Sequence, residues 1–157
     1  MRYQFTINAD HFQFYLEDDT IDRDTALLWS DQAQKDRLDV LPGLIAVATE
    51  RFGGEVAVAI EVVPREPTDP DFDVWDHVVE CSLEVEAERV LLTSAEADIS
   101  NAPEVVLPPG TYRARVYYAN LDSVGDELDL QGDDHYRIVL WPGMPMEPRV
   151  LKRKPLP

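Results

Sequence analysis

The chain has 157 residues, of which 45% are hydrophobic and 29% are charged, and its 31 acidic and 14 basic residues give a formal net charge of −17. This length and composition predict a single folded core and exclude a disordered chain. The acidic excess repels phosphates and anionic lipids, so it disfavours direct binding to nucleic acid or to a membrane and favours a basic protein partner. Maintenance of solubility is the alternative role of the charge.

Hydropathy and cysteine content predict the compartment. No apolar run approaches the ~20 residues of a membrane helix, and residues 1–5 show strand-like alternation instead of a leader pattern. We therefore expect a cytoplasmic protein. Cys81, the single cysteine, lies in an apolar stretch, which predicts a buried, inert thiol and no thiolate metal cluster.

The first third of the chain predicts two strands and one short helix. Apolar residues alternate with polar ones over residues 3–7 and 11–17, as in half-buried strands. Ser30 is a suitable N-cap for about two helical turns over residues 31–38. Pro42 marks the end of that helix.

Two apolar segments follow, over residues 44–49 and 55–63. Glycines lie between them, so we expect these two strands to pair as a hairpin. Residues 64–74 then hold three prolines and four acids, and this composition predicts a surface loop.

Residues 75–86 alternate again and predict a strand with a core face and an acidic face. A slip of one residue would place carboxylates in the core, so the faces are well specified. We expect Glu80, Glu84 and Glu86 to be exposed. The residues expected in the core are His77, Val79, Cys81, Leu83 and Val85.

The remaining segments predict short strands separated by turns, over residues 89–93, 104–107, 112–118 and 135–141. Together with the single short helix, they predict an all-β fold. The expected architecture is an antiparallel β-sandwich or jelly roll of about eight strands. We expect one β domain over residues 1–148 and a basic, proline-containing C-terminal tail over residues 149–157, which has four basic residues and no acid.

Sequence motifs of catalysis are missing. The chain has no Gly-x-Ser-x-Gly elbow and no phosphate-binding glycine loop, so we expect neither enzymatic activity nor a cofactor. His11, His77 and His135 lack the spacing of metal ligands and are interpreted as structural. A metal-dependent jelly-roll enzyme is an alternative, and it requires these three histidines to converge in space.

Acids are concentrated in two connections, residues 66–76 and 122–134. One hypothesis is a small-ligand or calcium-binding β-barrel, although neither connection follows the spacing of a calcium-binding hand. The favoured hypothesis is a protein-binding surface, because aromatic residues lie among these acids and aromatic anchors ringed by charge are typical of interfaces. The expected contact residues are Asp69, Asp71, Phe72, Asp73, Trp75, Asp76, Asp126, Glu127, Asp129, Asp133 and Asp134.

An ordered set of short segments resembles a known family. The segments are His-Phe-Gln-Phe at 11–14, Trp-Ser-Asp-Gln-Ala at 29–33, Leu-Pro-Pro-Gly-Thr-Tyr at 107–112 and Asp-His-Tyr-Arg-Ile at 134–138. Over residues 10–141 this pattern resembles the competence protein J family, inhibitors of the DNA-entry nuclease of competent bacteria, and similar uncharacterised bacterial proteins. Relative to that family, the two acidic connections are longer and the basic tail is additional.

The resemblance implies an inhibitor or immunity-type protein that blocks a basic partner such as a nuclease or toxin. This implication agrees with the charge, because an acidic β protein can occupy a phosphate-binding cleft as a phosphate mimic. It supplies no individual inhibitory residue.

Overall fold

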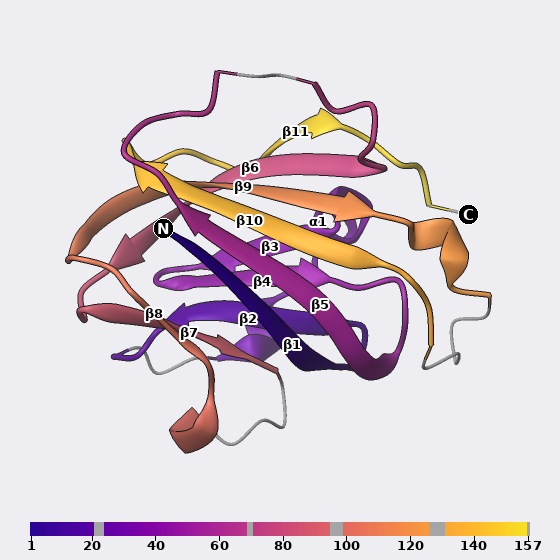
Figure 1. Cartoon of the computed structure of the whole chain (residues 1–157), viewed down its shortest axis with the longest axis horizontal. Coiled ribbons are helices and arrows are strands. Elements are labelled where there is room, and N and C mark those ends of the chain that lie inside the picture. Colours follow the sequence, from indigo (N-terminus) through magenta and orange to yellow (C-terminus); the bar gives the residue numbers. More distant parts are fainter. Residues whose placement is uncertain (21–23, 69–70, 95–98, 126–130, 157) are drawn as a thin grey trace.

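The computed structural model (Figure 1) describes residues 1–20, 24–68, 71–94, 99–125 and 131–156. Within these ranges β-strands predominate and the α-helical structure is one short helix, so the all-β fold class with one short helix is confirmed. None of the helices in this part of the chain is long and apolar enough to span a membrane. The elements are β1 (Arg2–Asp10), β2 (Gln13–Asp18), η1 (Thr25–Leu27), α1 (Asp31–Asp36), β3 (Leu38–Leu41), β4 (Leu44–Ala48), β5 (Gly53–Val62), β6 (His77–Val85), β7 (Arg89–Thr93), η2 (Ile99–Asn101), β8 (Glu104–Val106), β9 (Gly110–Ala119), η3 (Leu121–Ser123), β10 (His135–Pro142) and β11 (Arg149–Lys152).

The strands form one curled, mixed sheet, a half-barrel around the main core (Figure 1). Its order is β11-β6-β9-β10-β5-β1-β2-β4-β3, and β7 extends from β2 to pair with β8. The pairs are antiparallel except β5 and β10, which are parallel with Val58 opposite Tyr136. A parallel pair requires a long crossover, and the chain between β5 and β10 supplies one that includes β6 and β9.

The expected hairpin of residues 44–49 and 55–63 is wrong. β4 pairs with β2 and β3, whereas β5 pairs with β1 and β10. The β1–β2 hairpin lies between β4 and β5 and takes the edges that these two strands would otherwise share. Long-range pairing therefore overrides the shortest connection.

The predicted helix is confirmed, but it ends earlier than expected. Ser30 Oγ accepts a hydrogen bond from the backbone N–H of Ala33 at 3.2 Å, as an N-cap does. At the other end Arg37 adopts a left-handed conformation, φ 60°. This residue turns the chain into strand β3 at Leu38, and Pro42 lies in the turn between β3 and β4 instead of ending the helix.

Side chains hold the end of the sheet near α1 together. The Tyr118 hydroxyl donates to the Arg37 carbonyl, and His77 Nε2 donates to the Asp36 carbonyl at 2.7 Å. These bonds connect β9 and β6 to the segment between α1 and β3. The half-barrel is thus bridged here by side chains and not by a strand ladder.

The main core fills the concave side of the sheet. It contains large side chains from several strands, including Phe14, Tyr118 and Tyr136. Smaller apolar clusters cover parts of the outer face, one around Tyr15 on β2 and another around Tyr117 on β9. Both faces of the central strands are therefore partly buried.

The core face predicted for residues 75–86 is confirmed, because the alternate residues from His77 to Val85 are buried. Glu84 and Glu86 are exposed as expected. The expected exposure of Glu80 is wrong, since this residue is 2% exposed. Its carboxylate lies on the outer face, where two arginines of β9 neutralise it and β11 runs alongside.

The segment that the sequence marks as a basic tail contributes strand β11 to the edge of the sheet, with Arg149 opposite Glu80 in β6. Beyond this strand, Arg153 forms an ion pair with Asp36 at 2.7 Å. The backbone N–H of Lys154 donates to His77 Nδ1 at 3.0 Å.

Candidate partner-binding groove

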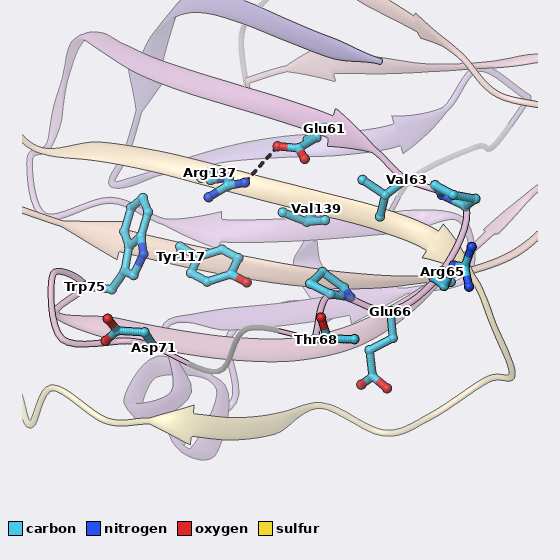
Figure 2. A pocket seen from close by; sticks show the side chains of 12 residues that line it. Glu61, Val63, Arg65, Glu66, Thr68, Asp71, Trp75, Tyr117, Arg137 and Val139 are labelled. Carbon is cyan, nitrogen blue, oxygen red and sulfur yellow. Dashed lines mark hydrogen bonds and ion pairs between the residues drawn. The ribbon is translucent and has the colours of Figure 1, made fainter.

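An open groove of about 650 Å³ lies on the outer face of the sheet, and we call it the outer groove. Strands β9 and β10 form its floor, and the connection between β5 and β6 forms its rim (Figure 2). This rim is the first of the two acidic connections singled out in the sequence. The groove is lined by Glu61, Val63, Pro64, Arg65, Glu66, Pro67, Thr68, Asp71, Trp75, Tyr117, Arg137 and Val139.

Aromatic rings form one end of the outer groove, where Trp75 and Tyr117 lie side by side (Figure 2). Their ring centroids are 5.0 Å apart, and Phe72 packs edge-on against Tyr117 with a centroid distance of 6.1 Å. Trp75 is half-buried and also packs edge-on against His135 at 5.7 Å. Such packing fixes the indole in one orientation while part of it stays accessible, as in a preorganised binding anchor.

Local hydrogen bonds shape the rim. The backbone N–H of Asp73 donates to Asp71 Oδ1 at 2.9 Å, and the N–H of Trp75 donates to the Phe72 carbonyl at 3.0 Å. The first is an aspartate turn of the kind that proline-rich, acidic segments favour. The turn places Trp75 two residues before the start of β6.

The alternation of β9 places two arginines and a tyrosine on the outer face. Arg113, Arg115 and Tyr117 point outward, while the residues between them join the main core. Arg137 of β10 lies over the Tyr117 ring at 5.5 Å and forms an ion pair with Glu61 at 2.7 Å (Figure 2). This stacking is a cation–π contact.

Arg115 also lies on the outer face, close to the aromatic rings of Tyr117 and Trp141. It forms ion pairs with Glu80 at 3.1 Å and Glu66 at 3.4 Å, and it lies over the Trp141 ring at 5.3 Å. Burial opposes its charge, but the hydrogen bonds that the guanidinium donates to the Tyr117 hydroxyl and to Glu80 outweigh burial and raise the pKa of Arg115 above its ordinary value. The guanidinium therefore stays charged, and its charge is balanced within the chain.

The predicted contact residues of the first acidic connection fall into two groups. Asp71 and Asp73 are exposed at the rim, and Phe72 and Trp75 are half-buried. Asp76 is partly buried and accepts a hydrogen bond from the backbone N–H of Leu121 at 2.8 Å, so it fixes the start of β6 against η3. Asp69 lies outside the described residues.

The second acidic connection is described only in part, and the predicted contact residues Asp126, Glu127 and Asp129 lie outside the described residues. Asp133 is exposed. Asp134 is 3% exposed, forms an ion pair with Arg51 and accepts a hydrogen bond from the Tyr136 hydroxyl at 2.8 Å. Its carboxylate is therefore engaged in the fold, and we leave Asp134 out of the proposed contact surface.

The sequence interpretation did not include the arginines on the outer face of the sheet. Tyr117, between them, is 5% exposed and lies under the rim. The signal that could have identified Arg115 and Arg137 is their placement on the polar side of two alternating strands. Which carboxylates pair with them depends on the register of β9 with β6 and β10.

The three histidines occupy different surroundings. His11 packs against Phe52, His77 against Tyr118 and His135 against Trp75. In the part of the chain that the structure describes, no group of three or more His, Cys, Asp or Glu side chains is arranged to hold a metal ion.

The curled sheet with one short helix has counterparts among solved structures. No protein-family model and no curated protein matches the sequence. The crystal structure of ComJ from Bacillus subtilis, inhibitor of the DNA degrading activity of NucA, has a TM-score of 0.67 and 14% identity, covering 91% of this chain and 99% of ComJ. The product of crocagin biosynthetic gene J has a TM-score of 0.65 and 16% identity, covering 92% of this chain and 98% of that protein.

At these identities the likeness shows a shared fold. It covers nearly the whole of each chain, so the similarity to the competence protein J family expected from the sequence is confirmed in the fold. The similarity does not by itself transfer the nuclease partner of ComJ to this chain.

Proposed function

We propose that the chain is a non-catalytic inhibitor of a DNA-degrading enzyme. It binds a basic surface of that enzyme through acidic side chains around the outer groove. The fold shared with ComJ over 91% of the chain is the observation that carries this proposal. A DNA-degrading enzyme must attract phosphates, so its DNA-binding surface is positive and complementary to an acidic inhibitor.

The distribution of charge supports an acidic binding surface. Intramolecular ion pairs occupy many of the basic side chains, and the 31 acidic residues outnumber the 14 basic ones, so the acidic excess determines the sign of the potential outside the molecule. Exposed acids at the rim of the outer groove include Asp71 and Asp73. The basic side chains in ion pairs are Arg37, Arg51, Arg89, Arg113, Arg115, Arg137, Arg153 and Lys154.

Trp75 supplies the apolar contact that charge alone does not. An exposed ion pair contributes only ~0 to 1 kcal/mol to binding, whereas a buried aromatic hot spot contributes ~2 kcal/mol or more. Trp75 is already oriented by Tyr117 and His135, so little conformational entropy is lost when a partner covers it. The acids accelerate association and the indole slows dissociation.

The experiment measures association of the immobilised chain with NucA, the nuclease that ComJ inhibits. One variant replaces Asp71, Asp73 and Asp133 by asparagine, and the matched control replaces Glu84, Glu86 and Glu88 by glutamine. All six residues are exposed. Glu84 lies seven residues, or about 23 Å at ~3.3 Å per residue, along β6 from His77, which begins the strand near Trp75.

The triple asparagine variant should associate at least tenfold more slowly at low salt, with the difference shrinking as the Debye length falls below ~10 Å. The control triple should keep most of the wild-type rate. Trp75→Ala should leave the association rate within about twofold and raise the dissociation rate by ~30-fold, because ~2 kcal/mol of contact is lost. Equal slowing by both triple variants would place the interface elsewhere and leave the charge as a general steering field.

A further inference from the structure

A second cavity, separate from the outer groove, lies beside α1 and has a volume of about 590 Å³. Five segments distant in sequence meet there: the β1–β2 turn, the segment from Trp29 to Arg37 that contains α1, the end of β4, the segment after η3, and Leu156. We call it the Arg37 pocket. It is lined by His11, Phe12, Trp29, Gln34, Arg37, Ala48, Thr49, Glu50, Val124, Gly125 and Leu156.

Arg37 lines this pocket and carries two donors that have no partner in the described part of the chain. Its side chain is 5% exposed, and its Nη1 donates to Glu50 Oε2 at 2.7 Å. Its Nε and Nη2 atoms are buried and have no hydrogen-bond partner among the described residues. Nearly all buried polar groups in folded proteins are satisfied, so two orphaned donors on one guanidinium indicate a missing acceptor.

The two orphaned atoms form one edge of the guanidinium plane. An Nε–H and an Nη–H that point the same way match the two oxygens of a carboxylate, in the bidentate geometry typical of arginine. Glu50 already balances the third nitrogen from the other side. The acceptor that fits is therefore a singly charged oxyanion that brings two oxygens to one edge.

The backbone around the pocket is strained. His11, Phe12, Trp29 and Arg37 have φ values of 54°, 64°, 72° and 60°, and among non-glycine residues of the described chain Asn120 is the only other with positive φ. Left-handed conformations are unfavourable for aromatic side chains and arginine, and helix ends of this type normally use glycine or asparagine. Such residues gather at ligand sites, where the surrounding structure holds them in place.

The apolar residues that line the pocket indicate that the ligand also carries an apolar group. Phe12 and Trp29 are half-buried aromatic residues, and Leu156 adds an aliphatic side chain. Trp29 is held in place because its Nε1–H donates to Gln13 Oε1 at 2.7 Å and its backbone N–H donates to Asp39 Oδ2 at 2.7 Å. The indole is thus oriented by the fold, and its ring surface remains for an apolar body. The volume is in the ~300 to 1,000 Å³ range of small-molecule sites.

We propose that the Arg37 pocket binds an aromatic or aliphatic carboxylate. The guanidinium turns toward the cavity on binding, so that the two carboxylate oxygens lie on Arg37 Nε and Nη2 and the apolar body lies against Phe12 and Trp29. The same chemistry has two sources, a free organic acid or the C-terminal carboxylate of a peptide. This site uses none of the residues of the outer groove and does not depend on the proposed inhibitor function.

The test is a calorimetric titration of the wild-type chain with 3-phenylpropionate and with N-acetyl-glycyl-phenylalanine. Each has a matched control in which an amide replaces the carboxylate. We expect the acids to bind and the amides to bind ~10- to 100-fold more weakly, because a charged, bidentate contact is lost. Binding of 3-phenylpropionate alone would identify a free acid as the source, and tighter binding of the peptide would identify a chain terminus.

Variants complete the test. Arg37→Lys keeps the charge but lacks the two adjacent N–H donors of the guanidinium, so this variant should bind the acids at least tenfold more weakly. Because Arg37 also ends α1, Trp29→Leu provides a second variant that leaves the guanidinium in place, and it should weaken the aromatic acid more than acetate. Equal binding of acids and amides, or no binding of either acid at millimolar concentration, would overturn the proposal.

Discussion

Glu80 of β6 and Arg115 of β9 are direct cross-strand partners, and the Glu80 Oε2 atom lies 3.1 Å from Arg115 Nε on the outer face of the sheet. Arg113 reaches the other oxygen of the same carboxylate at 3.3 Å. Because Glu80 is nearly inaccessible to solvent, this cluster fixes β6 to β9 below the rim of the outer groove. Breaking a buried pair by removing one partner is far more costly than losing an exposed one.

Glu80→Gln should therefore lower the free energy of unfolding by ~3 kcal/mol, because two arginines lose their counter-charge. Glu84 lies four residues along the same strand on the same side and is exposed, so Glu84→Gln should change stability by less than ~0.5 kcal/mol. Urea denaturation at neutral pH measures both. Equal midpoints for the two variants would show that the Glu80 cluster contributes nothing beyond a surface charge.

His77 should make stability depend on pH. Burial lowers the pKa of this imidazole from 6.5 to about 4, while both ring nitrogens bond to backbone groups of Asp36 and Lys154. Below pH 6.5 the unfolded chain binds a proton that the folded chain does not, so stability falls as pH drops from 6.5 to about 4 and this contribution then levels off.

The loss due to His77 should reach ~3 kcal/mol, at 1.36 kcal/mol per pKa unit. Other acids titrate below pH 5, so the informative quantity is the difference between the wild type and His77→Gln across this range. His135→Gln, at a partly exposed position, serves as the control. If wild type and His77→Gln lose stability in parallel between pH 6.5 and 5, His77 is not the source.

Asp18 joins the end of β2 to the connection between β6 and β7. Burial alone would raise its pKa, but hydrogen bonds from the backbone of Glu86, Thr20 and Ala87 outweigh burial and lower the pKa of Asp18 below 3.8. The carboxylate should thus stabilise the fold above pH 3.8, and this contribution should disappear as pH falls through the lower folded pKa.

Asp18→Asn should cost ~1 to 3 kcal/mol, because the partly buried backbone N–H groups of Glu86 and Ala87 lose a charged acceptor. Asp19→Asn, next in the chain and exposed, removes only an exposed ion pair with Arg89 and should cost ~0 to 1 kcal/mol. Thermal melting of both variants at neutral pH makes the comparison. A larger loss in Asp19→Asn would contradict the assigned role of Asp18.

Cys81 tests the orientation of β6. Burial, and to a smaller extent the charge of Glu80, raises the pKa of this thiol far above its ordinary value. Labelling by a thiol reagent should therefore be slow in the native protein and fast in denaturing urea. Fast labelling under native conditions would show that Cys81 does not face the core.

Local sequence patterns predicted the parts of the fold that depend on local physics. The Ser30 cap and the two-residue period of β6 are properties of neighbouring residues, and both are confirmed. Arg37 in a left-handed conformation was not predictable, since arginine has no local preference for it. The hairpin error has a related cause, because the insertion of β1 and β2 beside β4 is decided by long-range burial.

For the candidate sites, too, the sequence predicted what depends on local composition and did not predict what depends on contacts between distant segments. Acidic and aromatic composition directed attention to the connection that carries Phe72 and Trp75, and the structure places these residues at the aromatic end of the outer groove. Asp134 looked equally suitable by composition, yet its pairing with Arg51, distant in sequence, removes it from the surface. The Arg37 pocket has no signal in the sequence, because its lining comes from five separate segments.

The proposed inhibitor function is tested most directly by titrating the chain into a DNA-degradation assay with NucA, with ComJ as the positive control. We predict that DNA degradation falls in proportion to added chain, reaches its minimum near one chain per enzyme, and recovers when salt screens the charges. Full DNA degradation in the presence of excess chain, at low salt and at a concentration where ComJ abolishes it, would contradict inhibition of this class of nuclease.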